Sequence, residues 1–261
     1  MTNQILNGIA VEVSGEGSPL LCIHGLGGSS NTWTPVLPAL ANFKVIRFDL
    51  PGSGRSELGS TPLSIALYVQ TVEHVLEALG VDKVHIVAHS MGTIVAAHFA
   101  ARHPQRVNSL ALFGPLLAPP DAGRPGIQAR ADLARNGGIE AMQEIADAIV
   151  KGATAQQTKD DQPAVVALVR ECIMRQPAQG YSQSCEALSK AQPAAVEKIT
   201  APVLLVTGDQ DGVAPVAAVQ AFAARLADAH VVTFEACGHW TTFEKPAACV
   251  AELERFYQGI A

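Results

Sequence analysis

The segment Val87-Ala88-His89-Ser90-Met91-Gly92 restricts the fold of this chain more than any other. The apolar run that ends at Ala88 leads directly into Met91–Arg102, whose small and apolar residues suit a helix packed against a sheet. A strand that turns so abruptly into a helix needs small neighbours, and both Ala88 and Gly92 are small. The segment therefore predicts a strand–turn–helix unit with Ser90 at its corner.

Strand-like and helix-like segments alternate on both sides of this unit. Ser64–Leu79 carries apolar residues at spacings of three and four, which predicts a helix with one apolar face that ends at Gly80. Short apolar runs bounded by Gly or Pro predict strands at Leu20–Ile23, Val45–Phe48, Val84–Ala88, Leu110–Phe113, Val203–Val206 and Val231–Phe234. This alternation favours an α/β fold with a mostly parallel sheet flanked by helices, in which ligand sites lie at the carboxyl ends of the strands.

The alternation stops between about Pro115 and Val196, where the sequence predicts helices and no clear strand. The predicted helices are Ile127–Arg135, Ile139–Val150, Val165–Met174 and Tyr181–Ala191, and a last helix, Pro246–Tyr257, closes the chain. A length of 261 residues allows one large domain with an insertion. We therefore expect a core domain formed by residues 1–115 and 197–261 and a helical cap insertion formed by residues 116–196.

Composition argues against several classes of protein. A hydrophobic fraction of 48% with 16% charged residues predicts a well-buried core rather than a disordered chain. The net charge is −6 and the basic residues are scattered, so we expect neither a nucleic-acid nor a membrane partner. The sequence leaves the oligomeric state open.

The cysteines and the amino terminus indicate a compartment. Five cysteines, an odd number without C-x-x-C spacing, suggest reduced thiols. Residues 1–16 lack the pattern of a signal peptide, and no apolar stretch is long enough to span a membrane. These observations predict a cytoplasmic protein. No cluster has metal-ligand spacing, so neither a metal nor another cofactor is expected.

The Ser90 turn has the form of a nucleophile elbow, G-x-S-x-G, with Ala88 in place of the first glycine. Such a turn lifts the serine hydroxyl above the sheet, and the amino end of the following helix attracts a developing oxyanion. The same residues also fit a simple serine helix N-cap. The choice between these interpretations depends on whether the chain supplies a base for the hydroxyl.

His239 is the best of eight candidate histidines for that base, because it follows the last predicted strand. An acid is then needed to orient the imidazole. Asp209 and Asp211 both follow Val203–Val206, and we favour Asp211, since Asp209 directly after Gly208 suits a turn. The order Ser, Asp, His predicts a catalytic triad of Ser90, Asp211 and His239. A surface-loop histidine is the alternative for His239.

The glycine-rich segment His24–Gly28 follows the first predicted buried strand. Glycines let the backbone approach a substrate closely, so we predict that the Leu26 and Met91 N–H groups form an oxyanion hole. An ordinary glycine-rich turn is the alternative. A second loop, Asp49–Ser56, is interpreted first as structural, since Gly and Pro shape turns.

Aromatic residues near these loops supply candidates for substrate binding. Trp33 and Trp240 are the predicted substrate-binding residues, with Phe243 as a further pocket-lining candidate. Aromatic side chains near a site more often serve packing than recognition, so a core role stays open for each of them.

Together these motifs resemble the α/β-hydrolase superfamily over nearly the whole chain. Within it, the chain looks most like 3-oxoadipate enol-lactonases, because of Gly138–Met142 in the predicted insertion and Gln179–Leu188 before the strand that leads to Asp211. The resemblance implies a four-helix cap over the site and a small lactone substrate. One segment departs from the family: Ala148–Ala153 lacks the bulky aromatic residue expected after the helix. There Lys151 is a candidate to meet a substrate carboxylate, with a solvated helix-end lysine as the alternative.

The sequence therefore predicts a serine hydrolase that acts on an ester or a lactone through an acyl-enzyme. Two alternatives use the same triad: hydrolysis of a carbon–carbon bond and cofactor-free perhydrolysis. A third is a ligand receptor of the same fold that turns over slowly. Haloalkane dehalogenase and epoxide hydrolase chemistry is disfavoured, since those relatives carry aspartate where this chain has Ser90.

Overall fold

The computed structural model describes residues 2–260 and is organised around one eight-stranded sheet. The strand order is β1-β2-β4-β3-β5-β6-β7-β8, and every pairing from β4 to β8 is parallel. The strands are β1 Thr2–Leu6, β2 Ile9–Ser14, β3 Ser18–Ile23, β4 Phe43–Phe48, β5 Val84–His89, β6 Val107–Phe113, β7 Val203–Gly208 and β8 Ala229–Phe234. The predicted α/β class with a mostly parallel sheet is confirmed.

The hairpin of β1 and β2 is the part of the sheet that the sequence analysis did not predict. These strands pair antiparallel around Asn7-Gly8, and β2 then pairs antiparallel with β4. Asn7 and Gly8 have φ of 48° and 80°, which is the backbone that a two-residue Asn-Gly hairpin turn requires. The Asn7-Gly8 dipeptide is the sequence feature that could have predicted this hairpin.

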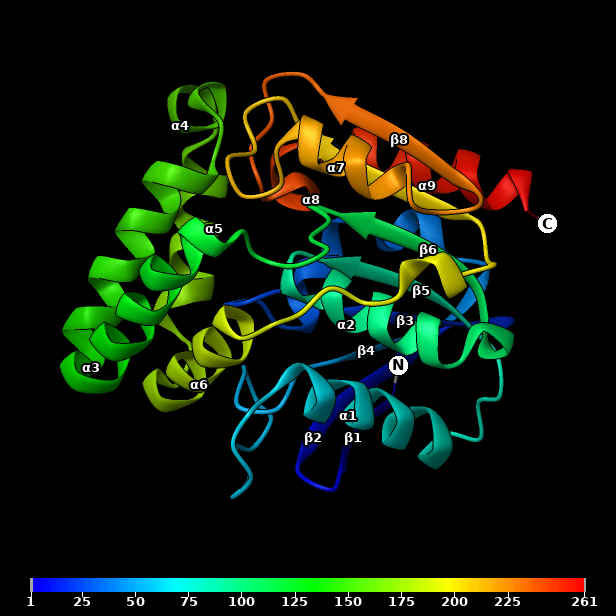
Figure 1. Cartoon of the computed structure of the whole chain (residues 1–261), viewed down its shortest axis with the longest axis horizontal. Helices are drawn as coiled ribbons and strands as arrows, with labels where there is room; N and C mark the ends of the chain where they lie inside the picture. Colours follow the sequence, from blue (N-terminus) through cyan, green and yellow to red (C-terminus); the bar gives the residue numbers. More distant parts are fainter. Residues whose placement is uncertain (1, 261) are drawn as a thin grey trace.

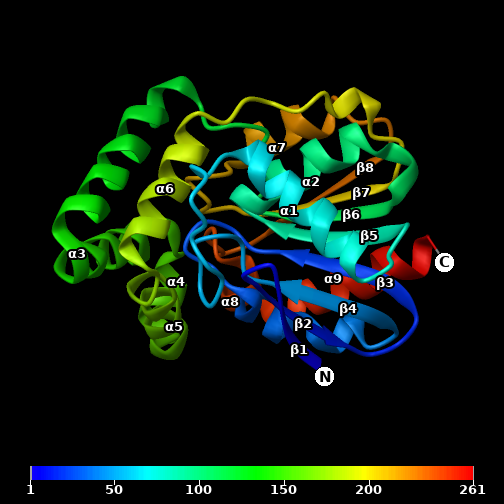
Figure 2. The same cartoon turned by 90° about the horizontal axis from the view of Figure 1, so that it is seen from below.

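Helices cover both faces of the sheet (Figure 2). On one face lie α1 Ile65–Ala78, α2 Met91–Arg102 and α7 Val216–Ala223, whose apolar side chains join one buried cluster with the strands. On the other face η1 Ser30–Leu40 and α9 Pro246–Gly259 form a second cluster. Four short elements complete the core: η2 Pro104–Arg106, η3 Asp121–Gly123, η4 Val196–Lys198 and α8 Thr241–Glu244.

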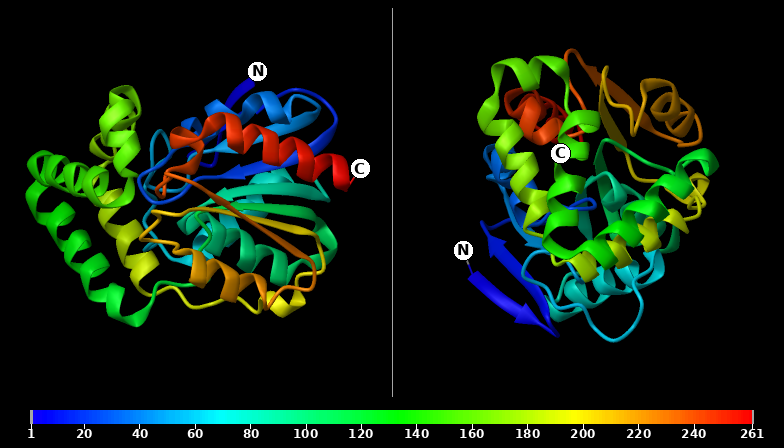
Figure 3. Two further views of the ribbon diagram at one scale, coloured as in Figure 1. Left: turned by 90° about the horizontal axis from the view of Figure 1, so that it is seen from above. Right: turned by 90° about the vertical axis from the view of Figure 1, so that its left-hand side faces the viewer.

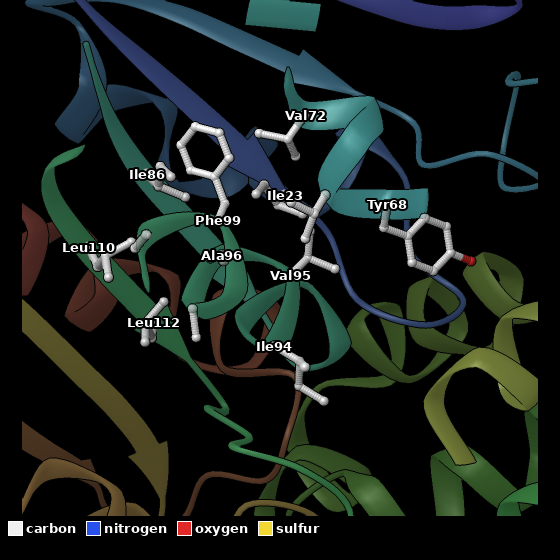
Figure 4. Packing of buried hydrophobic residues seen from close by; sticks show 14 of the residues in the cluster. Ile23, Tyr68, Val72, Ile86, Ile94, Val95, Ala96, Phe99, Leu110 and Leu112 are labelled. Carbon is white, nitrogen blue, oxygen red and sulfur yellow. The ribbon is translucent and has the colours of Figure 1, made fainter. Parts of the chain in front are cut away.

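Helix α2 holds the serine turn in place because it is buried on nearly every side. Ile94, Val95 and Phe99 are fully buried, and Figure 4 shows them among side chains of β3, β5, β6 and α1. Each fully buried side chain of this kind contributes roughly 1.5–3 kcal/mol of hydrophobic stabilisation. Strand β5 and helix α2 are thus fixed on both sides of Ser90.

Four helices between β6 and β7, which we call the inserted helices, lie beyond the carboxyl ends of the parallel strands (Figures 1 and 3). They are α3 Arg124–Ala153, α4 Gln156–Asp161, α5 Pro163–Met174 and α6 Ala178–Ser189. Helix α3 unites two predicted helices, with a break at Gly138 where φ is 58° and ψ is −134°. None of the helices within residues 2–260 is both long and apolar enough to cross a membrane.

Candidate active site

Ser90 lies in a strained turn between β5 and α2. Its φ of 52° and ψ of −122° are unusual for a residue with a side chain, and such a conformation costs of order 1–3 kcal/mol. The Ser90 N–H donates to the Phe113 carbonyl at 3.0 Å, which anchors the turn on β6. A Cβ added to Gly92 would lie 2.5 Å from the His24 carbonyl oxygen, so the small residue predicted for this position is required. The hydrogen bond to β6 and the close packing against His24 hold this strained turn, and with it the hydroxyl, at the carboxyl edge of the sheet.

Hydrogen bonds join Ser90, His239 and Asp211 in one chain. The Ser90 Oγ lies 2.8 Å from His239 Nε2, and His239 Nδ1 lies 2.8 Å from Asp211 Oδ2. The three residues are 7%, 5% and 3% exposed, respectively. Because an ionised carboxylate only accepts hydrogen bonds, Nδ1 carries the proton and Nε2 is free to accept the proton of Ser90. This arrangement can activate the serine hydroxyl as a nucleophile.

The Asp211 carboxylate is held by its own loop. Its Oδ1 accepts hydrogen bonds from the Val213 and Ala214 N–H groups, both at 2.8 Å. Burial raises the pKa of Asp211, but the His239 ring and these N–H groups outweigh burial and hold the pKa below its ordinary value. Asp209 instead accepts from the Cys237 N–H at 3.1 Å and supports the turn. Asp211 is thus the aspartate that orients His239.

His239 is fixed through its backbone as well as its ring. Its N–H donates to the Ala153 carbonyl at 2.9 Å, and His89 Nε2 lies 2.9 Å from its carbonyl oxygen. Burial, together with the nearby His239 ring, lowers the pKa of His89 to about 3, so His89 is a neutral donor. The sequence placed His89 beside a strand but gave no signal for this contact, which joins residues far apart in the chain.

The His24–Gly28 loop lies directly against the serine turn. A Cβ on Gly25 would lie 2.7 Å from the Ser90 Cβ. The loop is pinned by His24, whose Nδ1 donates to the Gly25 carbonyl and whose Nε2 accepts the Leu50 N–H, both at 2.8 Å. Within residues 2–260 neither the Leu26 nor the Met91 N–H donates to a protein acceptor. Both predicted oxyanion donors are therefore available to a ligand.

A small cavity of about 60 Å³ adjoins Ser90 and His239. Its walls come from the strand-end loops and from the inserted helices, and they are Leu26, Ser90, Leu116, Arg130, Ile149, Ala153, Ile173, Tyr181, Leu188, Val213, His239 and Trp240. A larger cavity of about 300 Å³ lies elsewhere, between the β1–β2 hairpin and α1, and the triad residues do not line it. The chemistry of the walls, rather than the size of the cavity, therefore identifies the site.

Of the two predicted substrate-binding tryptophans, Trp240 lines this cavity and Trp33 does not. Trp33 is fully buried in η1 and contacts Phe113 edge-on, with ring centroids 6.2 Å apart. The prediction that Trp33 binds substrate is therefore wrong. Helix η1 directs the Trp33 ring into the buried cluster that η1 forms with α9. Phe243 stacks on Trp240 rather than lining the cavity.

Two polar side chains that the sequence analysis missed tie the inserted helices to the loops of the site. The buried Glu244 carboxylate accepts from Thr158 Oγ1 at 2.7 Å, from the Ala155 and Gly238 N–H groups at 2.8 and 3.0 Å, and from the Trp240 N–H at 3.1 Å. The Gln176 side-chain amide donates to the Gly27 carbonyl at 3.1 Å. No local sequence pattern predicts the contacts of Glu244 with Ala155 and Thr158 or of Gln176 with Gly27, because these partners are distant in the chain.

Comparison with known proteins agrees with this geometry. The family model described as alpha/beta hydrolase fold matches residues 18–246. The chain belongs to this family. The structure of this alpha/beta hydrolase has the features on which the resemblance was based. These are the mostly parallel sheet, the serine turn between β5 and α2, and the chain order Ser, Asp, His.

Similar proteins include an enol-lactonase, an enzyme that degrades N-acyl homoserine lactones, and a hydrolase of dienedioates. The enol-lactonase from Burkholderia xenovorans LB400 superimposes with a TM-score of 0.88 at 26% identity, over 98% of this chain and 100% of that one. A solved N-acyl homoserine lactone degrading enzyme matches with a TM-score of 0.77 at 25% identity, over all of both chains. A 2-hydroxy-6-oxononadienedioate/2-hydroxy-6-oxononatrienedioate hydrolase from Paraburkholderia phymatum is 28% identical over 252 residues, which are 92% of this chain and 84% of the relative.

Proposed function

We propose that this chain is a serine hydrolase that opens a small lactone or cleaves a carboxylic ester. The observation that carries the proposal is the hydrogen-bonded chain from Ser90 through His239 to Asp211. The free N–H groups of Leu26 and Met91 beside the serine support it, since acyl transfer needs donors for an oxyanion. The similarity to an enol-lactonase and to an enzyme that degrades N-acyl homoserine lactones also supports a lactone or ester substrate.

The proposed reaction proceeds in two halves. His239 Nε2 takes the Ser90 proton as Oγ attacks the carbonyl carbon, and Asp211 stabilises the resulting imidazolium. The Leu26 and Met91 N–H groups hold the oxyanion. The carbonyl–oxygen bond to the leaving group then breaks, and His239 gives its proton to the departing alkoxide. In a lactone, that alkoxide stays attached to the acyl chain.

Water completes the proposed cycle. His239 removes a proton from a water molecule that attacks the acyl carbon, and the bond to Ser90 Oγ breaks with return of that proton to the serine. The products are a carboxylic acid and an alcohol, or one hydroxy acid when the substrate is a lactone. The inserted helices, as the proposed cap, cover this step, and a cavity of about 60 Å³ favours small acyl groups.

The test is a set of initial rates on γ-lactones, including 3-oxoadipate enol-lactone, and on short acyl esters, with Ser90→Ala in parallel. We expect hydrolysis by the native chain and a loss of about 10⁴- to 10⁶-fold in kcat for Ser90→Ala. Ser60→Ala, on an exposed loop, is the matched control and should leave the rate unchanged. Turnover by Ser90→Ala at the native rate contradicts the assignment.

Carbon–carbon bond hydrolysis by the same triad is the second candidate. The observation in its favour is the similarity, over 92% of this chain, to the dienedioate hydrolase. A 2-hydroxy-6-oxo-dienedioate belongs in the same panel for this reason. If Ser90-dependent cleavage of that compound is faster than hydrolysis of any ester or lactone, the function is carbon–carbon bond hydrolysis.

A further inference from the structure

Within residues 2–260, three polar groups of residues that line the catalytic cavity have no nitrogen or oxygen atom as a hydrogen-bond partner. They are the Arg130 Nε, the Tyr181 hydroxyl and the Trp240 Nε1, and all three atoms are buried. Tyr181 is 2% exposed and Trp240 is 3% exposed. Leaving a buried donor unpaired is unfavourable, and more so for a charged group. Three such groups around one cavity indicate that a ligand supplies the missing acceptors.

Arg130 is also unpaired as a charge. Within residues 2–260 its guanidinium forms no ion pair with a carboxylate, although its neighbours on α3, Arg124 and Arg135, each pair with an aspartate. The Cys185 thiol lies beside both Arg130 and Tyr181, and a thiol is a weak partner. A guanidinium in a largely apolar wall is costly unless an anion offsets it.

The rest of the wall favours a negative ligand. None of the twelve residues that line the cavity is acidic, and seven are aliphatic. Burial raises the pKa of the Tyr181 hydroxyl, which keeps it protonated and able to donate. Arginine, tyrosine and tryptophan present only donors or donor-capable groups here, and a guanidinium matches the geometry of a carboxylate in particular.

We propose that Arg130, with the Tyr181 hydroxyl and the Trp240 indole N–H, binds a carboxylate of the substrate while Ser90 attacks its ester or lactone carbonyl. The inference rests on the proposed function and deepens it by assigning the substrate class: acyl compounds that carry a second, ionised carboxyl group. It also replaces Lys151 as the candidate for this contact. Lys151 is exposed and does not line the cavity.

The test compares two substrates of equal length, monomethyl glutarate and methyl valerate, which differ by one carboxylate. We expect the native chain to prefer the acidic ester in kcat/KM. Arg130→Met should lose about ten- to hundred-fold on the acidic ester through KM, with the neutral ester changed less than threefold. Arg130→Lys should recover part of the preference, because it keeps the charge but not the planar fork. Lys151→Met, on the same helix, is the matched control and should keep the native preference.

Two results overturn this inference: a native chain that does not prefer the acidic ester, and an Arg130→Met variant that keeps the preference. Hydrolysis of the neutral ester alone therefore contradicts the carboxylate site and leaves the proposed function standing. Calorimetric titration of monomethyl glutarate into Ser90→Ala, and into Ser90→Ala with Arg130→Met, tests the site without turnover. Binding only when Arg130 is present supports it, and equal or absent binding in both proteins contradicts it.

Discussion

The side chains of Asp211, His239 and His24 on the strand-end loops have hydrogen-bond partners, whereas Arg130 and Tyr181 on the inserted helices leave buried donors unpaired in the cavity wall, as does the loop residue Trp240. Asp211 accepts two backbone N–H groups and contacts His239, and His24 uses both ring nitrogens. Among the described residues 2–260, the buried Arg130 Nε on α3 and the buried Tyr181 hydroxyl on α6 have no nitrogen or oxygen partner. Fully paired groups are fixed before a substrate arrives, and unpaired groups gain their partners from it. Under the proposed function, the strand-end loops carry out the reaction and the inserted helices select the substrate.

The largest effect expected from disturbing the loop side is that of Asp211→Asn. An amide in place of the carboxylate favours the wrong tautomer of His239, and an analogous change in a serine protease triad lowers kcat about 10⁴-fold. We expect a loss of that order in kcat, measured on the best ester or lactone, with little change in folding.

Asp209→Asn is the matched control, because Asp209 lies two residues away and, within residues 2–260, its carboxylate accepts a hydrogen bond only from the Cys237 N–H. It should retain activity within about tenfold. Equal losses in the two variants show that the loop as a whole, rather than the Asp211–His239 contact, determines the rate.

How far the sequence predicts this site depends on the distance over which each contact acts. The elbow at Ser90 is local, since strand, turn and helix follow one another within a few residues, and its small neighbours are readable in the sequence. The identities of Asp211 and His239 follow from their places after strands β7 and β8, because parallel strands end at one edge.

Other features depend on tertiary contacts that no periodicity encodes. Trp33 lies close to the glycine-rich loop in sequence, yet η1 turns it into the core. Glu244 and Gln176 bind atoms far away in the chain, so neither residue type nor spacing identifies them. The proposed role of Arg130 cannot be predicted from the sequence, because it depends on the position of the side chain in the cavity wall and on its having no carboxylate partner within residues 2–260.

A substitution at the junction of the two regions sharpens the comparison. Glu244→Gln places a donor where Ala155, Thr158 and Gly238 already present donors to one oxygen. We expect the free energy of unfolding to fall by about 1–3 kcal/mol, because buried donors lose their acceptor. We also expect kcat to fall by about tenfold to a hundredfold as the His239 loop shifts.

Denaturant unfolding and initial rates measure these two effects. Lys245→Gln, at the neighbouring residue, is the control and should change neither by a comparable amount. A Glu244→Gln protein with native stability and rate shows that the inserted helices and the loop are positioned by their apolar contacts alone.

The smallest expected effect concerns the loop Asp49–Ser56, which its Gly and Pro residues led us to interpret first as structural. Asp49 is fully buried, and Arg55 donates to it at 2.8 Å. Burial raises the pKa of Asp49, but the hydrogen bond from Arg55 and other donors hold the pKa below its ordinary value. We expect Arg55→Gln to cost about 1 kcal/mol at pH 7, a modest figure because Arg55 is half exposed.

The stabilisation from the Asp49–Arg55 contact depends on pH in a direction that follows from the lowered pKa of Asp49. A lowered carboxyl pKa stabilises the fold above the unfolded value of 3.8 and loses that contribution as pH falls through the folded value. The stability difference between the native chain and Arg55→Gln should therefore be largest above about pH 4 and shrink below it. A difference that grows on acidification contradicts this account, as does a large change in kcat at pH 7.

The most direct test of the central claim is covalent labelling with an alkyl fluorophosphonate, followed by intact-mass and peptide mass spectrometry. Attack by an activated serine displaces fluoride, so the account predicts one adduct, on the peptide that contains Ser90. It also predicts no adduct in Ser90→Ala and a labelling rate reduced by orders of magnitude in His239→Ala. Labelling at another residue, or none in the native chain, contradicts the claim that Ser90 is the nucleophile activated by His239.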